Sequence, residues 1–445
     1  MEIVLELNHK QLAPALLRAD NKSLLRIINE VAARYLFFAM FLVAAPATGQ
    51  YKSLALSIKK TDSAQLAKEN NENNYLKQQR DLSDVVSSLL KKNLTIDREP
   101  DTVAPKLNYS IVPAIGYTLQ TKFAVVISGN AAFHLSPDAK LSAITASATY
   151  TQNKQFFVPV LSNISTKGNR FKLIGDLRFY KYPQSTFGLG SAAPIENEDP
   201  MDYTYIRVYE TVLKKIKGNL FAGLGYNLDH HWNISHQGNK NGTPSDYAAY
   251  DTSERTTSSG ITLNGVYDSR DNPINANKGF YTNFQLRNNF TFLGSNSNWQ
   301  SIILDVRKYV RFPRNSHNVL AFWSYNTIIA YGKPPYLDLP STGWDNYNAT
   351  GRGFIQGRYR GNKMVYLESE YRFRLTKNGL LGGVVFANEE SFSGVKGTSL
   401  EAFQLGYGLG VRIKLNKLSN TNLSIDYGFG TQGSNGLFVT VGEAF

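Results

Sequence analysis

The chain has 445 residues, of which 48 are Lys or Arg and 35 are Asp or Glu, and it contains no cysteine. The lack of cysteine excludes disulfide frameworks, cysteine-ligated metal sites and thiol catalysis. Charged residues make up only 19%, whereas tyrosine and phenylalanine occur 26 and 25 times, so the composition argues against a disordered, collagen-like or helical membrane protein.

The N-terminal 49 residues are predicted to be a signal peptide. Their apolar run, residues 35–46, is about a dozen residues long, whereas a membrane-spanning helix needs roughly 20. The run follows Arg34 and precedes small residues, which places a cleavage site between Ala47 and Gln50. An N-terminal core helix is the alternative, and the long leader before the apolar run leaves the true start codon open.

Residues 50–105 are predicted to form a short, partly helical periplasmic arm. The segment is rich in Lys, Asn and Gln and nearly lacks aromatic residues. Apolar residues recur with helical spacing at Leu82, Val85, Val86, Leu89 and Leu90. The arm is short for a folded accessory domain with its own core, so a charged, solvated helix is the expected structure.

From residue 106 to the C-terminus, apolar and polar residues alternate with the period of two that is typical of β-strands. Between Phe171 and Tyr180, one face carries Phe, Leu, Gly, Leu and Phe and the other carries Lys, Ile, Asp, Arg and Tyr. A similar division into an apolar and a charged face recurs between Val365 and Leu375. Many predicted strands have roughly 10 to 15 residues, which suits a tilted bilayer crossing. The sixteen predicted strands are 107–117, 122–134, 142–151, 154–164, 170–181, 202–213, 218–230, 256–268, 278–292, 298–311, 317–331, 364–376, 379–388, 398–414, 421–429 and 436–445.

The alternation alone fits both a soluble β-sandwich and a transmembrane β-barrel, which differ in where the apolar face points. With both ends of the barrel on the periplasmic side, the long connections 182–201, 231–255 and 332–363 all fall on the extracellular side, and the opposite turns are mostly tight. This segregation is typical of outer-membrane proteins. We therefore predict an all-β fold, a 16-stranded antiparallel transmembrane β-barrel over residues 106–445, in the outer membrane of a Gram-negative bacterium.

The last predicted strand is amphipathic and ends in an aromatic residue. Leu437, Val439, Val441 and Phe445 are expected on one face, which Glu443 interrupts near the periplasmic rim. A terminal aromatic residue on such a strand resembles the insertion signal of outer-membrane proteins. An ordinary terminal strand is the alternative.

Two stretches resemble a known family. The connection after the eighth predicted strand reads DSRDNP at 268–273 and KGFY at 278–281, and the longest loop contains GRGF at 351–354 and QGRYRGN at 356–362. Together with sixteen strands, these motifs resemble the barrel domain of the BamA/TamA superfamily of outer-membrane assembly and translocation factors, the bacterial surface-antigen family. The resemblance covers roughly residues 106–445, and Arg-Gly-Phe is its strongest part because this family places that motif in its sixth extracellular loop.

The resemblance implies that the sixth loop folds back into the lumen, with Gly353 at the bend and Phe354 as an anchor. A buried guanidinium group needs a carboxylate partner, because an unpaired charge inside a crowded barrel is costly. Glu370 on the next strand is the partner that the family pattern implies for Arg352. A surface arginine in a mobile loop is the alternative.

The resembled family has a second acidic residue on the thirteenth strand, in a Phe-x-Asp-x-Gly pattern. In this sequence Asn388 stands where the aspartate is expected, within Phe386-Ala-Asn-Glu-Glu390. Either Arg352 uses Glu370 alone, or Glu390 takes part as well.

The motif from Asp268 to Gly279 is predicted to build a defined periplasmic hairpin rather than a binding site. Asp268 and Arg270 can pair across the turn, Pro273 sets the turn and Gly279 restarts the strand. A calcium site that includes Asp271 would have too few oxygen ligands at the spacing of a calcium-binding loop.

We predict no catalytic site, metal site or cofactor. Adjacent histidines point to opposite faces of a strand, so His230, His231 and His236 are interpreted as polar loop residues. The sequence has no Gly-x-Ser-x-Gly elbow, phosphate-binding loop or His-Glu-x-x-His motif. Basic residues are scattered over lumen and loop positions, which favours outer-membrane lipids with anionic head groups over nucleic acid as the electrostatic partner.

Two functional classes fit the sequence. The first, implied by the resemblance, is a non-enzymatic factor that inserts or exports outer-membrane or surface polypeptides, in which the first and last strands part. The family's periplasmic substrate-handling domains are not recognisable, so a periplasmic partner protein would supply their function. The second class is a passive solute pore or a structural surface barrel.

Pro113 lies in the middle of the first predicted strand, which closes the barrel by pairing with the last. Proline cannot donate a hydrogen bond to a ladder. Pro113 would therefore leave one bond unmade at this closure and favour its opening. Alternatively, Pro113 lies at a bulge or beyond the paired region and only ends the hydrogen bonding.

Overall fold

The computed structural model describes residues 78–89 and 108–445, apart from 119–120, 346–347, 395–398 and 418. The predicted signal peptide and most of the predicted arm lie outside the described residues. Within the described ranges, no helix has the length and hydropathy that a membrane-spanning helix requires.

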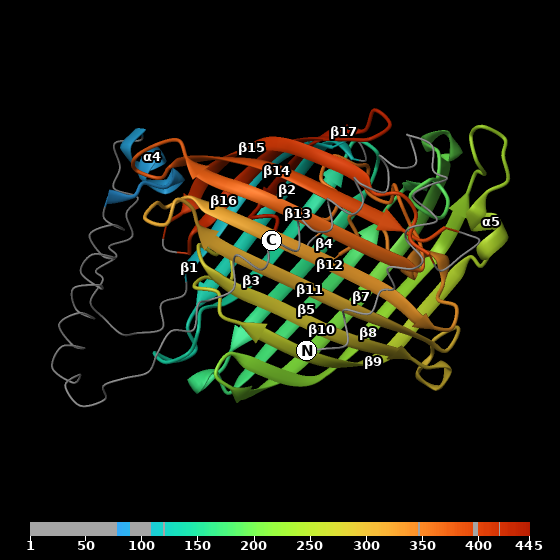
Figure 1. The fold of residues 1–445 in the computed structure, drawn as a ribbon, viewed down its shortest axis with the longest axis horizontal. Coiled ribbons are helices and arrows are strands. Elements are labelled where there is room, and N and C mark those ends of the chain that lie inside the picture. The colour runs from blue at the N-terminus through green and yellow to red at the C-terminus, as the bar shows by residue number, and fades with distance from the viewer. Residues whose placement is uncertain (1–77, 90–107, 119–120, 346–347, 395–398, 418) are drawn as a thin grey trace, which may run out of the picture. The chain divides into compact units, whose positions relative to one another are not determined.

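Residues 108–445 fold into a nearly closed barrel of sixteen antiparallel strands (Figure 1). Each barrel strand pairs with the next one along the chain. The barrel strands are β1 (Asn108–Thr118), β2 (Lys122–Phe133), β3 (Ser142–Thr151), β4 (Phe156–Ser165), β5 (Phe171–Lys181), β7 (Asp199–Lys217), β8 (Leu220–His236), β9 (Arg255–Asp268), β10 (Gly279–Asn289), β11 (Trp299–Arg311), β12 (Val319–Tyr331), β13 (Lys363–Arg374), β14 (Leu381–Phe392), β15 (Gln404–Asn416), β16 (Thr421–Gly430) and β17 (Asn435–Val441). The predicted all-β barrel with sixteen strands is confirmed.

The remaining elements are short and lie between the barrel strands or before them. Strand β6 extends the sheet inside a loop by pairing with the start of β7. These elements are α4 (Leu82–Leu89), η1 (Lys167–Asn169), β6 (Gln184–Thr186), η2 (Ile195–Asn197), α5 (Asp246–Tyr250), η3 (Thr291–Leu293) and η4 (Tyr336–Asp338).

The connections differ in length between the two ends of the barrel. The three longest, residues 182–198, 237–254 and 332–362, all lie at one end, which we call the long-loop end. The opposite end, the short-turn end, carries connections such as 218–219 and 417–420. In Figure 1 the long-loop end is on the right, marked by α5.

The two faces of each strand differ in polarity in the way the alternation predicts. On β5, Leu177 and Phe179 are each 39% exposed. Asp176 and Arg178, which alternate with them in the sequence, are buried at 6% and 3%. The apolar face therefore points outward and the charged face points into the lumen, which is the arrangement of a transmembrane barrel and the reverse of a soluble sandwich.

Helix α4 is attached to the short-turn end through its first turn. Asp81 and Asp84 each accept a hydrogen bond from the other's backbone N–H, at 3.1 and 3.0 Å. The Asp81 carboxylate also accepts from the backbone N–H of Lys417, and Lys417 Nζ lies 2.7 Å from Asp84 Oδ2. The backbone N–H of Arg80 donates to the carbonyl of Asn378 in the β13–β14 turn. The helix is thus fixed to two neighbouring turns.

The C-terminal residues correct one expectation. The last strand ends at Val441, and Gly442 has a φ of +113°, which turns the chain away from the strand. Phe445 does not share the outer face of Val439: it is buried in the lumen at 5% exposure and stacks on Trp323 at 5.1 Å. Glu443 also enters the lumen instead of interrupting the apolar face. A glycine turn, which strand periodicity does not anticipate, reverses the direction of these side chains.

A closed barrel of this kind resists unfolding because it has few free strand edges. We therefore expect the detergent-extracted protein to migrate faster on a denaturing gel when it is unboiled than after boiling. The same chain after denaturation in urea serves as the control and should migrate as the boiled form. Migration that does not depend on heating would contradict the barrel.

Candidate functional site

Loop six, which we define as residues 332–362, enters the lumen and contacts the barrel wall with its Arg-Gly-Phe segment. Gly353 has a φ of +108°, and a Cβ there would lie 2.7 Å from the carbonyl oxygen of Phe429 on β16. Only glycine combines this backbone conformation with so close an approach. The next residue, Phe354, is 3% exposed and packs edge-on against Tyr359 of the same loop, at 5.5 Å between ring centroids.

Arg352 lies among three carboxylates from two different strands. Its guanidinium group contacts Glu368 and Glu370 on β13, and its Nη1 lies 2.6 Å from Asp426 Oδ2 on β16. The guanidinium carbon also sits 3.9 Å from the ring centroid of Phe386 on β14. Arg352 is 3% exposed, so these contacts occur away from solvent, where charged hydrogen bonds are strong and an unpaired charge is costly.

Two of the three carboxylates, Glu370 and Asp426, each contact one more arginine. Arg372 Nη2 lies 2.6 Å from Glu370 Oε2, and Arg412 Nη1 lies 2.5 Å from Asp426 Oδ1. Arg412 also binds Glu443 at 2.7 Å, which ties the C-terminus to the same network. We call these seven residues the loop-six network: Arg352, Glu368, Glu370, Arg372, Arg412, Asp426 and Glu443.

Asn388 and Glu390 both contact loop six, but neither binds the Arg352 guanidinium. Asn388 Nδ2 donates a 2.9 Å hydrogen bond to the backbone carbonyl of Arg352. Glu390 Oε1 accepts a 3.0 Å hydrogen bond from Thr342 Oγ1. The structure supports neither of the two alternatives that the sequence left open. Arg352 contacts Glu368 and Asp426 in addition to Glu370, and it does not contact Glu390.

Sequence reasoning missed Glu368 and Asp426. Strand alternation could have predicted Glu368, because it lies two residues before Glu370 and so faces the same side of β13. Asp426 is 74 residues from Arg352 in the sequence and has no motif around it that marks it as a partner.

The motif from Asp268 to Gly279 forms a turn at the short-turn end that hydrogen bonds and ion pairs hold together. Arg270 donates to both carboxylate oxygens of Asp268, at 3.0 and 3.1 Å, and Lys172 Nζ lies 3.0 Å from the same carboxylate. Burial opposes the charged form of Arg270, but the Asp268 carboxylate outweighs it and raises the pKa of Arg270. Arg270 Nη1 also donates to the Pro273 carbonyl at 3.4 Å. Gly279 has a φ of +117°, and a Cβ there would lie 2.5 Å from the Ser269 carbonyl oxygen, so the position requires glycine.

The same turn also contacts the β15–β16 turn. Asp271 Oδ1 accepts from the backbone N–H of Asn277 at 2.9 Å, which holds the turn in shape. The amide of Asn275 donates to the Asn420 carbonyl at 3.3 Å, and the amide of Asn420 donates back to the Asn275 carbonyl at 3.1 Å. The motif therefore joins two turns that are far apart in the sequence, a contact that the sequence did not predict.

The lumen on the side of β5 to β11 holds a second set of buried ion pairs. Arg178 binds Asp176 at 2.7 Å, and Arg287 binds Asp229 at 2.6 Å. Arg207 bridges the two acids at 3.4 Å from each. We call this set the second network.

The three histidines lie in strand β8 and not in a loop, which corrects their interpretation as loop residues, and they contact different residues. His230 Nδ1 lies 2.8 Å from Thr257 Oγ1, His231 stacks on Tyr205, and His236 Nδ1 lies 3.0 Å from Asp199 Oδ2. Within the residues that the structure describes, no group of three or more His, Cys, Asp or Glu side chains could hold a metal ion.

Strands with an apolar outer face that surround a charged lumen define a transmembrane β-barrel, and a loop bound into that lumen distinguishes it from a simple porin-like tube. Residues 136–445 match the Omp85 superfamily domain, and the chain belongs to this superfamily. This match confirms the family resemblance that the sequence motifs predict.

Solved structures with a similar fold include BamA from Haemophilus ducreyi lacking POTRA domains 1–3, with 12% identity and a TM-score of 0.49 over 77% of this chain and 75% of that chain. CdiB from Acinetobacter baumannii has 11% identity and a TM-score of 0.48 over 76% and 66% of the two chains. CdiB from Escherichia coli has 12% identity and a TM-score of 0.46 over 75% and 66%. Comparison with curated protein sequences gave no match.

Proposed function

We propose that this barrel inserts or exports outer-membrane polypeptides, and that client strands engage it at the junction between β1 and β17, which we call the seam. The observation that carries the proposal is the hydrogen bonding of the two strands. Among the described residues, hydrogen-bonded ladders join every consecutive pair of barrel strands, but none joins β1 to β17. Their backbone edges are therefore available to a third strand, since an unpaired edge is a template for strand addition.

The direction of the β1 backbone groups supports the prediction that Pro113 leaves one hydrogen bond unmade at the seam. The backbone N–H of Gln152 donates to the Phe123 carbonyl at 2.7 Å, so Phe123 directs its backbone groups toward β3. In an antiparallel ladder, its β1 partner Tyr117 then directs its own groups away from β2, toward the seam. Alternation places Pro113, opposite Ile127, in the same row. Proline has no N–H, so this row lacks one donor at its middle.

The filling of the lumen disfavours the passive-pore alternative. Barrels of sixteen strands that conduct solutes keep an open aqueous channel. Here loop six, the loop-six network and the second network occupy the lumen, and Arg358 and Arg360 of loop six are buried at 1% and 2%. Arg358 donates to the Ala193 carbonyl at 2.7 Å, so loop six is also bonded to the loop that precedes β7.

The proposal includes the surroundings of the protein. Omp85-superfamily barrels are outer-membrane proteins of Gram-negative bacteria, and we assign this chain the same location, with the long-loop end extracellular. Outer-membrane lipids, including anionic head groups, surround the apolar face, and client polypeptides approach from the short-turn end. A periplasmic partner protein delivers these clients.

Depletion of the protein, followed by quantification of the outer-membrane proteome, tests the proposal. We expect a defined set of barrels or surface proteins to fall in abundance while the remaining outer-membrane proteins stay constant. A matched strain that re-expresses the wild-type chain from a plasmid is the control and should restore that set. An unchanged proteome together with altered solute uptake would contradict the proposal.

A further inference from the structure

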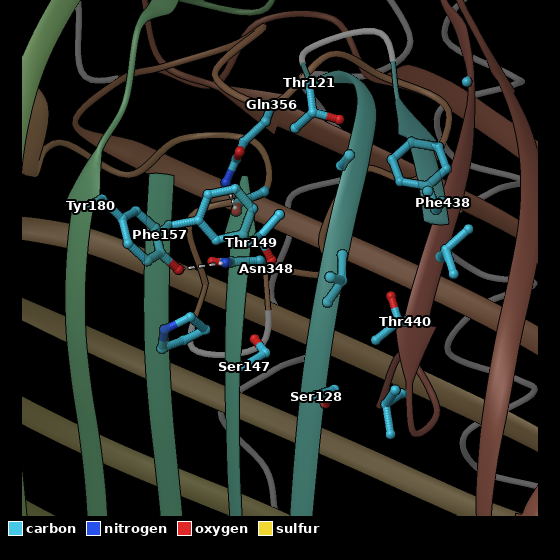
Figure 2. Close-up of a pocket in the computed structure, with 18 of the residues that line it drawn as sticks. Thr121, Ser128, Ser147, Thr149, Phe157, Tyr180, Asn348, Gln356, Phe438 and Thr440 are labelled. Carbon is cyan, nitrogen blue, oxygen red and sulfur yellow. Dashed lines mark hydrogen bonds between the residues drawn. The ribbon is translucent and has the colours of Figure 1, made fainter. Parts of the chain in front are cut away.

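The two faces of β5 and its neighbours differ in whether their polar groups have partners. On the inner face, Tyr180 points toward a lumenal cavity of about 310 Å³, and its hydroxyl accepts a 3.1 Å hydrogen bond from Asn348 of loop six (Figure 2). Asp176 and Arg178 pair on the same face. The outer face is apolar at Leu177, but it carries one unpaired carboxylate on the adjacent strand.

That carboxylate belongs to Glu210 of β7, which lies on the outer face near the middle of the wall. Glu210 is directly opposite Gly175 of β5 and Tyr226 of β8. Four residues of β5 precede Gly175 and six follow it. Gly175 shares the outer face with Leu177 by alternation, and residues directly opposite each other in a ladder share a face, so Glu210 points outward as well. The next outward residue on β7, Val212, is 52% exposed.

Among the described residues, none forms an ion pair or a hydrogen bond with the Glu210 carboxylate. Gly175 makes room for this carboxylate, because a Cβ there would lie 3.0 Å from Glu210 Oε1 and 2.6 Å from Ser162 Oγ. Tyr226 lies directly beside Glu210, but its hydroxyl is hydrogen-bonded to Ser259 Oγ at 2.9 Å instead. The outer wall therefore presents a carboxylate that the barrel itself does not compensate.

Glu210 also differs in depth from the other acidic residues on the outer face. Asp202 and Glu389 alternate with buried neighbours and point outward, but each lies three residues from the long-loop end of its strand. The remaining Asp and Glu residues of the barrel strands are buried. An ionisable side chain at mid-depth is costly against lipid, and in membrane proteins such residues mark functional sites.

We propose that the outer wall around Glu210 binds a membrane-spanning segment of another protein, and that this segment presents a lysine or arginine to Glu210. A cation is the complementary group, because apolar surroundings strengthen an ion pair and make an unpaired charge costly. Leu177 and Val212 supply apolar surface around the pair. Counted from β1, β7 is the sixth of the sixteen barrel strands, so a partner bound there leaves the seam free. The inference goes beyond the proposed function, since it does not require client insertion.

A second copy of this chain does not supply the cation. Lys214 and Lys308 alternate with buried residues and point outward, but each lies three residues from the short-turn end of its strand. The other Lys and Arg residues of the barrel strands are buried or lie within two residues of a strand end. Two copies inserted in the same direction hold equivalent residues at equal depth, so none of these cations lies opposite Glu210. Lipid head groups lie at the edges of the apolar band and do not reach it either.

Association in vesicles tests the inference. The purified full-length protein carries a donor fluorophore at Thr252→Cys, an exposed loop position in a chain without other cysteines, and is placed in phosphatidylcholine vesicles. The probe is an acceptor-labelled, bilayer-spanning helical peptide of Leu and Ala with one central Lys, compared with the same peptide carrying Leu there. We expect energy transfer to show about tenfold tighter binding of the lysine peptide. Glu210→Gln should bind both peptides equally, and Glu210→Lys should prefer a peptide with a central Glu.

The matched control is Glu389→Gln, which removes an outward carboxylate near the long-loop end. It should keep the wild-type preference, and heat-modifiable migration confirms that each variant is folded. Equal binding of the two peptides to the wild type, no binding of either, or a lysine preference that persists in Glu210→Gln would overturn the inference. Loss of the preference in Glu389→Gln would overturn it as well.

A photo-crosslinker at Val212 applies the same test in native outer membranes. We expect an adduct with another polypeptide that is lost in Glu210→Gln and retained in Glu389→Gln. Capture of lipid only, an adduct of twice the mass of this chain, or an adduct that Glu210→Gln leaves unchanged would each overturn the inference.

Discussion

Replacing Arg352 with methionine is expected to lower the free energy of unfolding by about 3–5 kcal/mol, the cost of removing one partner from a buried ion pair. The substitution leaves Glu368 without an arginine in contact, whereas Glu370 keeps Arg372 and Asp426 keeps Arg412. Equilibrium unfolding in urea, with the barrel in detergent or lipid, measures the change. Protease treatment of intact cells should in addition cleave loop six faster than in the wild type.

A double-mutant cycle shows whether the effect arises from the ion pair. Arg352→Met combined with Glu368→Gln should be less destabilised than the sum of the two single variants, because the second change removes the unpaired carboxylate. Arg255→Met, at an exposed arginine on the rim of β9, is the control and should stay within about 0.5 kcal/mol of the wild type. Wild-type stability of Arg352→Met, with loop six equally protected, would refute the loop-six network as a lock.

Exchange of the two charges of the pair Arg352 and Glu370 is not expected to restore stability. Arg352 faces three carboxylates, so a glutamate there would lie beside Glu368 and Asp426. An arginine at position 370 would lie beside Arg372. Each exchanged residue would meet like charges, so the pair cannot be inverted in isolation.

A disulfide across the seam is expected to abolish the proposed function. Cysteines at Gly116 and Val439 would have Cβ atoms about 3.6 Å apart, which is within the range that a disulfide needs. The chain has no cysteine of its own, so Gly116→Cys with Val439→Cys forms a single defined bond. Under oxidising conditions, the abundance of client proteins should fall to the level of the depletion strain, and a reductant should restore it.

The control disulfide joins strands that a ladder already holds together. Ser324 and Leu367 are direct partners in the β12–β13 ladder, so Ser324→Cys with Leu367→Cys adds a bond without closing the seam. This variant should support normal client levels in both redox states. If the oxidised Gly116–Val439 variant also supports normal client levels, seam opening is not part of the function and the passive-barrel class becomes the better account.

The sequence by itself determined the barrel, its strands and the polarity of its faces. Periodicity is a local property: each strand such as β5 carries its outward Leu177 and inward Arg178 within a few residues, so the pattern is visible without knowing the neighbours. The grouping of the long loops at one end follows from counting strands. The Arg-Gly-Phe motif also identified loop six, because its three residues are adjacent and can be found in the sequence without knowledge of the fold.

Only the tertiary structure decided which groups meet inside the lumen. Asp426 contacts Arg352 from β16 because the curvature of the barrel brings β13 and β16 to the same loop. The separation of these residues in the sequence does not predict that contact. Phe445 points into the lumen because Gly442 has a positive φ, which ends the alternation of inward and outward side chains along β17. The missing β1–β17 ladder depends on how the first and last strands meet, and closure of the barrel determines that geometry.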